Sequence, residues 1–143
     1  MPPKHSPKRQ GEWAEVRFLE QCFRRQLNVS KPFGDNTQYD FITDSAGFLR
    51  RVQVKSVSRL SGSSYRVTLG RGGGRKRGYS LRDADLLAAY VFPCDTWYLI
   101  PIAAVAGKKS IRLLPLHAAS GKYEGFRNSW SLLRPNRQSG TRR

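Results

Sequence analysis

The residues most able to act together chemically lie in the segment YDFITDSAGFLRRVQVKSVS, residues 39–58. Asp40 lies in the first of its two apolar runs, and Gln53 and Lys55 lie in the second. Side chains alternate between the two faces of a strand, so Gln53 and Lys55 share one face and the flanking valines take the other. A half-buried lysine beside an acid is costly unless the acid stays ionised to pair with it, and Asp40 is placed to be that acid. The pattern therefore raises the hypothesis that these residues act together.

A simpler interpretation is a cross-strand pair of Asp40 and Lys55 on a solvated face, which stabilises a sheet by a few tenths of a kcal/mol. Acidic residues are scarce in this chain, with 10 Asp and Glu against 26 Lys and Arg. Nevertheless, Glu15 falls on the helix that is expected to converge on this hairpin. The scarcity of acids and their convergence favour the functional interpretation.

The charge balance of the chain points to its partner. The 143 residues carry a formal net charge of +16, which repels itself in a compact state unless a polyanion neutralises it. Nucleic acid is therefore the expected partner, with a ribosomal-type RNA binder and a membrane-surface protein as alternatives. The membrane alternative is disfavoured because the sequence has no lipidation signal, no bilayer-length apolar run and no long basic amphipathic helix. No apolar stretch follows the basic residues of MPPKHSPKRQGEW, so no secretory signal is expected and the cytoplasm is the expected location.

Several other kinds of site are disfavoured by the sequence. Cys22 and Cys94 lie far apart without a CxxC motif, and only His5 and His117 could join them, so a zinc site is not expected. Both cysteines lie in apolar contexts and are expected to be reduced core residues. With two histidines in unsuitable contexts, a nucleophilic Ser or Cys triad is not expected either. The GKKS at 107–110 lacks the upstream glycine of a Walker A motif.

The chemistry-bearing residues need elements to position them, and the first of these is a helix. Residues 1–10 hold three Pro and three Lys or Arg, which predicts a flexible basic arm. From Gly11 onward, apolar residues recur at helical spacing and predict a helix of about four turns. The predicted apolar stripe consists of Val16, Leu19, Phe23 and Leu27, flanked by Trp13 and Cys22.

The rest of the chain predicts strands, a basic loop and a second helix. The hairpin strands are expected at about 39–43 and 48–57, joined by the turn DSAG, which has the Asp and Gly that a type I turn prefers. A third strand is expected beside the hairpin at 64–70, interior strands at 86–93 and 96–105, an edge strand at 110–116 and a terminal helix at 121–133. Together, residues 11–133 predict one α/β or α+β domain with helices packed on a mixed sheet, followed by a flexible basic tail at 134–143.

An acidic residue before a hairpin, with a Q-x-K tripeptide on its second strand, resembles the active-site pattern of the PD-(D/E)xK nucleases. Within that superfamily the chain is most similar to the endonucleases associated with group I introns, a homing-endonuclease family. The residues that carry the resemblance are GEWAEVRFLEQ, SKPFGDNTQYDFI, RVQVKS, DADLLAAYVFPCDTWYLIP and YEGFRNSWSLL, so the similarity covers roughly residues 8–133.

The resemblance implies a restriction-endonuclease-like α/β fold, with a mixed sheet flanked by helices, and Mg²⁺ or Mn²⁺ as the cofactor. It makes Asp40 the principal metal ligand, with Glu15 leaning toward the same ion directly or through water. Gln53 takes the position usually held by Glu; its neutral amide oxygen is a weaker ligand, and the backbone carbonyl of Val54 assists. Lys55 orients or activates the attacking water and stabilises charge on the phosphate. No small-molecule cofactor is expected.

Other polar residues have simpler explanations. Glu12 is expected to interact with the dipole at the start of the helix, and Glu20 to pair with the arginine one turn later. Asp83 and Asp85 are expected to end the basic loop and pair with its arginines. His117 lies beside an apolar run and is expected to be structural.

The glycine-rich stretch RGGGRKRGYSLRD, residues 71–83, is too densely charged to be stable without phosphate, and contact with the DNA backbone is favoured over a solvated loop. Lys31 and Asn36, just before Asp40, are weaker candidates for DNA contact. The predicted DNA-binding residues are Lys31, Arg71, Arg75, Lys76, Arg77 and Arg82.

The sequence therefore predicts a magnesium-dependent endonuclease that cleaves double-stranded DNA at a specific site. Cleavage of both strands requires two active sites, so a homodimer or homotetramer is expected. Two alternatives remain. One is a basic DNA-binding module that has lost catalysis, as Gln53 in the place of the usual Glu would indicate. The other is a nuclease of the Holliday-junction-resolvase or repair type.

Overall fold

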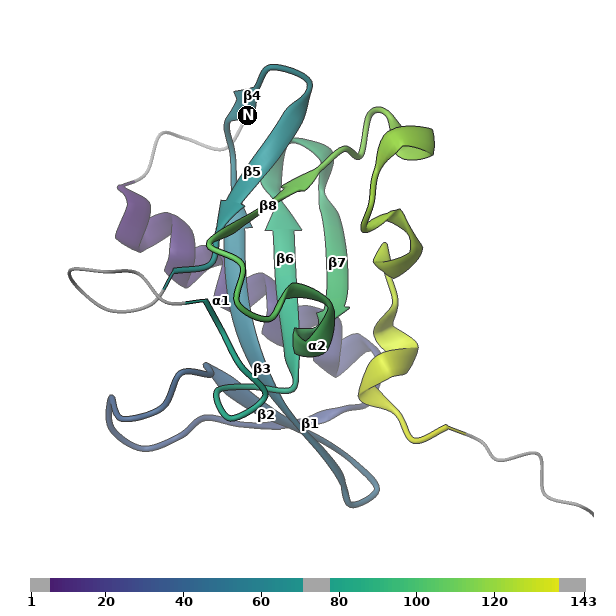
Figure 1. The fold of residues 1–143 in the computed structure, drawn as a ribbon. Helices are drawn as coiled ribbons and strands as arrows, with labels where there is room; N and C mark the ends of the chain where they lie inside the picture. The colour runs from purple at the N-terminus through teal and green to yellow at the C-terminus, as the bar shows by residue number, and fades with distance from the viewer. Residues whose placement is uncertain (1–5, 71–77, 137–143) are drawn as a thin grey trace, which may run out of the picture.

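Two β-sheets form the centre of the chain in the computed structural model, which describes residues 6–70 and 78–136. The larger sheet has five strands in the order β1-β2-β3-β6-β7, and the smaller has three in the order β4-β5-β8. Helix α1 covers one face of the larger sheet, while α2 and β8 lie over the other (Figure 1). The strands of the larger sheet are β1 (Asn28–Ser30), β2 (Phe41–Ser45), β3 (Phe48–Val57), β6 (Leu86–Val91) and β7 (Thr96–Pro101).

Helix α1 spans Pro7–Arg24 and starts earlier than the sequence pattern predicts. The side chain of Ser6 caps it by accepting a hydrogen bond from the Arg9 backbone N–H at 3.3 Å, and proline suits the first helical turn because its missing N–H is not needed there. The prediction of a flexible arm over residues 1–10 is therefore wrong for residues 7–10, and residues 1–5 lie outside the described part of the chain.

The predicted buried face of α1 is also wrong in part. Val16 and Phe23 are 62% and 74% exposed, whereas Ala14, Phe18 and Cys22, spaced four residues apart, are buried. A small alanine and a cysteine let the helix approach the sheet closely, and this packing selects the face. Burial raises the pKa of Cys22 to about 12, so its thiol stays protonated, as expected for a reduced core cysteine.

Aromatic rings fill the core between α1 and the sheet. The ring of Phe18 stacks on Phe41 of β2 at 5.5 Å between centroids, and it contacts Trp97 of β7 and Trp130 at 5.9 and 6.0 Å. Such pairs stabilise a core beyond the area they bury. This cluster holds α1 against β2 and β7.

The larger sheet is mixed, as the sequence predicts. β2 and β3 form the predicted antiparallel hairpin, β3 pairs with β6 in parallel, and β6 pairs with β7 in antiparallel. Every residue of β6 is buried, because the strand lies between two neighbours and both of its faces are covered. The prediction of interior strands at 86–93 and 96–105 is confirmed for β6; β7 ends the sheet but is also largely buried.

The strand predicted beside the hairpin at 64–70 is in the other sheet. β5 (Ser64–Thr68) pairs with β4 (Leu60–Ser61) and with β8 (Ser110–Leu113), so its position is a correction. The reason is the tight turn at Gly62, where φ is +64°, which folds the chain back on itself after β3. β8 ends the smaller sheet, as expected of an edge strand. The short α2 (Ile102–Val105) follows β7.

The predicted terminal helix at 121–133 is not an α-helix. The segment forms two 3₁₀ turns, η3 (Glu124–Phe126) and η4 (Trp130–Leu133), separated by Asn128 with a left-handed φ of 51°. A residue in this conformation ends helical hydrogen bonding. The segment runs beside β7 (Figure 1) and bridges it through Arg127 and Tyr98. The other 3₁₀ turns are η1 (Phe92–Cys94) and η2 (Ala118–Ser120).

Candidate functional site

The candidate site lies where the pairing between β2 and β3 stops. The last ladder pair is Phe41 with Val52, and the backbone N–H of Asp40 donates to the carbonyl of Val52 at 2.9 Å. Beyond this point β2 no longer faces β3, and the backbone N–H of Val54 donates to the side-chain Oδ2 of Asp40 at 2.7 Å. This bond to a carboxylate is short and fixes the side chain of Asp40 at the end of the ladder.

Glu15 on α1 and Asp40 converge, and their carboxyl groups are close enough to interact electrostatically. Burial raises the pKa of Glu15, and the negative charge of Asp40 adds to that rise. Burial also raises the pKa of Asp40, although the Val54 N–H and the positive charges of Lys55 and Lys31 act in the opposite direction. Two partly buried carboxyl groups that repel each other are a common feature of functional sites.

Lys31 provides a counter-charge at the surface side of this pair. Its Nζ lies 3.8 Å from Oε1 of Glu15 and 5.3 Å from the centroid of the Phe41 ring. The lysine side chain is 66% exposed, whereas that of Glu15 is 26% exposed. Since exposed ion pairs are weak, Lys31 compensates only part of the repulsion between the two acids.

Gln53 and Lys55 lie on the face of β3 opposite to Val52 and Val54. Val52 and Val54 pack in the core beneath α1, whereas Nζ of Lys55 lies 5.9 Å from the centroid of the Tyr79 ring, which belongs to the core on the other face. Both polar side chains are half-buried. The charge of Lys55 nevertheless lowers the pKa of Asp40, so the two groups interact electrostatically at this end of the ladder.

Gln53 makes a contact that the sequence does not predict. Its Nε2 donates to the backbone carbonyl of Val54 at 3.3 Å. The side chain and the carbonyl that were predicted to act together as weak metal ligands therefore bond to each other.

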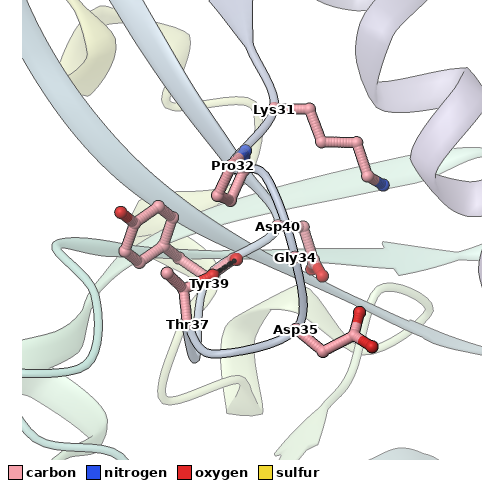
Figure 2. A pocket seen from close by; sticks show the side chains of 7 residues that line it. All are labelled: Lys31, Pro32, Gly34, Asp35, Thr37, Tyr39 and Asp40. Atoms are coloured by element: carbon pink, nitrogen blue, oxygen red, sulfur yellow. Dashed lines mark hydrogen bonds between the residues drawn. The ribbon is translucent and has the colours of Figure 1, made fainter.

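A pocket of about 200 Å³ opens beside Asp40, and Figure 2 shows the side chains that line it. The loop between β1 and β2 forms this pocket, and the hydroxyl of Thr37 donates to the carbonyl of Tyr39 at 3.0 Å within it. The ring of Tyr39 points away from Lys31 (Figure 2). The lining residues are Lys31, Pro32, Gly34, Asp35, Thr37, Tyr39 and Asp40.

Sequence reasoning did not assign Asp35, Thr37 or Tyr39 to the site. The only signal for them was their place in the loop that leads into Asp40.

The oxygen atoms gathered at this site are of the kind that binds a hard divalent cation. Two carboxylates whose ionised forms repel each other, an amide oxygen and a backbone carbonyl are oxygen ligands of the type that Mg²⁺ prefers, and a cation would relieve the repulsion. Among the residues described, no three or more His, Cys, Asp or Glu side chains gather to hold a metal. Within that part of the chain, a third side chain that binds an ion together with Glu15 and Asp40 would be of another type, such as Gln53.

The turn after the basic loop is fixed to β3 by a network around Arg51. The guanidinium of Arg51 donates to both carboxylate oxygens of Asp85, at 3.1 and 3.3 Å, and to the carbonyls of Leu81 and Arg82, at 2.7 and 2.8 Å. The expectation that Asp85 pairs with arginines of the loop is wrong within the described residues, because Arg51 on β3 is close enough to bind it bidentately. Asp83 accepts a hydrogen bond from the Ser80 backbone N–H at 2.8 Å.

Of the predicted DNA-binding residues, Lys31 and Arg82 are described and exposed. Arg71, Arg75, Lys76 and Arg77 lie outside the described residues.

Glu12, Glu20 and His117 are at the surface. Glu20 pairs with Arg24 at 3.7 Å, as expected, and also with Arg17 at 3.7 Å. Glu12 and His117 are exposed. In the described part of the chain, no helix is long and apolar enough to cross a lipid bilayer.

Comparison with known proteins agrees with this geometry. The family model for PD-(D/E)XK endonucleases matches residues 5–131. Among solved structures, the bacterial homing endonuclease I-Ssp6803I is similar, with a TM-score of 0.80 and 27% sequence identity, over 90% of this chain and 93% of that chain. No curated protein sequence matches.

Proposed function

The chain belongs to the PD-(D/E)XK endonuclease family, and on this premise we propose that it is a Mg²⁺-dependent endonuclease that cleaves double-stranded DNA at a specific site. The observation that carries the proposal is the convergence of Glu15 and Asp40 at the end of the β2–β3 ladder, with the charge of Lys55 acting on Asp40. Nucleases of this family generally use divalent metal ions. The similarity to a homing endonuclease supports DNA as the substrate and cleavage at a specific site.

In this proposal Asp40, Glu15, Gln53 and the carbonyl of Val54 hold the cation, Mg²⁺ with Mn²⁺ as a substitute. When bound, the ion would polarise the scissile phosphate and lower the pKa of a water molecule. The Val54 N–H keeps Asp40 oriented before substrate arrives. Such preorganisation matters because a ligand held in place need not be ordered during the reaction.

Lys55 has a separate role in the proposal, to stabilise the negative charge that grows on the phosphate oxygens and to orient the attacking water. Its Nζ is near the face of the Tyr79 ring, which favours the charged form of the lysine. Lys31 and Arg82, both exposed, are proposed to contact the DNA backbone, together with the basic residues of the loop at 71–77. The cleavage of both strands would need two copies of the chain or four.

One observation favours a second candidate function, a DNA-binding module without catalysis. Gln53 occupies the position usually held by an acid in the family, and its amide is bonded to the carbonyl of Val54. Because an amide oxygen is a weaker metal ligand than a carboxylate, Asp40 and Glu15 are the only strong ligands in the proposed set.

A plasmid-nicking assay separates the two functions. We expect supercoiled plasmid to be nicked with Mg²⁺, left intact with EDTA and left intact by Lys55→Ala while DNA binding persists. Lys109→Ala, which removes one positive charge from an exposed position, is the matched control and should retain nicking. Binding without nicking by the unaltered protein, with either Mg²⁺ or Mn²⁺, would support the inactive module. Cleavage of a four-way junction but not of plasmid or linear duplex would indicate a resolvase.

A further inference from the structure

Phe33 has no role in the fold. It lies in the loop between β1 and β2 and is 104% exposed, more than any other large apolar side chain described. A phenylalanine stabilises a protein by burial, and this ring buries nothing within the chain. Single exposed apolar residues are common on protein surfaces, so the position of Phe33 must decide whether its exposure has meaning.

The loop around Phe33 is fixed on both sides. Pro32 restricts the backbone just before the ring, and Gly34, with φ at +83°, makes the turn just after it. Lys31 is held by Glu15, and Thr37 is hydrogen bonded to the carbonyl of Tyr39. Because both ends of the loop are restrained, the exposed ring is presented at a defined place.

That place is the rim of the candidate site. Pro32 and Gly34 both line the pocket beside Asp40, whereas Phe33 between them does not (Figure 2). The exposed ring of Phe33 therefore belongs to the loop that lines the pocket but does not itself line the pocket.

The charge of the loop indicates which part of DNA this ring meets. Residues 31–40 contain Lys31, Asp35 and Asp40, so the segment has more acidic than basic side chains in a chain whose formal charge is +16. Apart from Lys31, which is proposed to contact the DNA backbone, this loop therefore offers no positive charge to phosphate. A flat apolar ring instead matches the π-face of a nucleobase, on which aromatic side chains stack with little regard to base identity.

We propose that Phe33 packs against a nucleobase next to the phosphate that is cleaved and so positions the strand over Asp40. The inference rests on the proposed function, because it assumes that DNA binds at this site. A ring at this position would act on an unstacked or kinked base step, as apolar wedges do in other DNA-binding proteins.

The test uses the full chain and a fluorescein-labelled 40-base-pair duplex of random sequence, with Ca²⁺ in place of Mg²⁺ to prevent cleavage. We expect Phe33→Ala to fold normally and to weaken binding by about 5- to 150-fold, the range that corresponds to the stacking of one base. The dependence of binding on salt should not change, because no phosphate contact is lost. Phe23→Ala, which removes an equally aromatic and 74% exposed side chain on α1, is the matched control and should bind as the unaltered protein does.

A cross-linking arm identifies the contact directly. Irradiation of the complex with 5-iodouracil-substituted duplex should attach DNA to the peptide that contains Phe33, and Phe33→Leu should abolish this adduct. Affinity of Phe33→Ala within twofold of the unaltered protein would overturn the inference and leave the nuclease proposal intact. A change in sedimentation without loss of DNA affinity would overturn it in favour of contact with a second copy. If the unaltered chain binds no DNA, both proposals fail.

Discussion

The hydrogen bond between Asp40 and Val54 makes a prediction that separates the structural role of Asp40 from its charge. Asp40→Ala removes the acceptor of the Val54 N–H, whereas Asp40→Asn keeps an acceptor oxygen and removes only the charge. Both variants should lose nuclease activity. They should differ in stability, because only the alanine variant leaves the backbone N–H at the end of the ladder without its protein partner.

The size of this difference follows from the 2.7 Å bond. Leaving a buried donor unsatisfied costs about 1–3 kcal/mol. The charge itself should contribute little favourable free energy without metal, because burial raises the pKa of Asp40. We therefore expect Asp40→Asn to equal or exceed the unaltered protein in stability at pH 7, and Asp40→Ala to fall about 1–3 kcal/mol below Asp40→Asn.

Urea denaturation in EDTA, followed by tryptophan fluorescence, measures the difference. With a slope of about 2 kcal/mol per molar urea, the midpoints of the two variants should lie about 0.5–1.5 M apart. The pH dependence of the urea midpoint shows whether the ionised Asp40 stabilises or destabilises the fold. A folded-state pKa above the unfolded value, which is about 3.9, means that the folded state holds the proton more tightly, so stability falls as pH rises through that interval. The asparagine variant should lack this contribution.

Two results would refute this reasoning. Equal midpoints for the alanine and asparagine variants would show that the Asp40 side chain does not satisfy the Val54 N–H. A loss of more than about 1 kcal/mol in Asp40→Asn, measured in EDTA at pH 7, would show that the ionised carboxylate stabilises the fold, contrary to the direction of its pKa.

Three further predictions concern metal, packing and pH. Mg²⁺ should raise the thermal midpoint of the unaltered protein in differential scanning fluorimetry, because the folded state gains about 1.4 kcal/mol for each tenfold increase in Mg²⁺ concentration above the dissociation constant. Glu15→Gln should reduce this shift of the midpoint. An equal shift in the variant would remove Glu15 from the ligand set. Gly78→Ala should lower the free energy of unfolding, measured in urea, by about 1–3 kcal/mol, because the new Cβ would lie 2.5 Å from the backbone carbonyl carbon of Gly107. Gly11→Ala on α1, where the new Cβ would meet nothing within 4 Å, should raise it by about 0.5–1 kcal/mol. The opposite order of stabilities would contradict the close approach of Gly78 to Gly107. Although burial acts in the opposite direction, hydrogen bonds from Arg51 lower the pKa of Asp85. The stability that the ionised Asp85 contributes is therefore present above about pH 4 and is lost as pH falls through the folded-state pKa. In Asp85→Asn the urea midpoint should change less between pH 5 and pH 3 than in the unaltered protein, and an unchanged pH profile would argue against the pair of Arg51 and Asp85.

The hairpin could be predicted from the sequence because local signals agree there. Alternating apolar residues, the turn DSAG and the buried run of β6 each specify one structure, and β2, β3 and β6 appear as expected. The face of α1 could not be predicted in the same way. Its apolar residues lie on more than one side, and only contact with Phe41 and Trp97 selects Phe18 over Phe23 for burial.

The candidate site, too, could be predicted from the sequence only in part. Residue types and alternation were enough to put Glu15, Asp40 and Lys55 forward as a group. The contacts between them depend on where β2 begins relative to β3, and no periodicity encodes that starting point. The bond between Gln53 and the carbonyl of Val54, and the loop residues around the pocket, depend on backbone geometry that composition does not specify.

The end of the β2–β3 ladder has a consequence for how new DNA targets could arise in this protein. Asp40 is held by its bonds to Val52 and Val54, and these bonds do not depend on how many residues separate β1 from β2. Insertions or deletions near Phe33 would therefore reshape the surface that we propose to meet DNA, while the acid keeps its place. Recognition and cleavage can then change at different rates in evolution, although the residues responsible are neighbours in the chain.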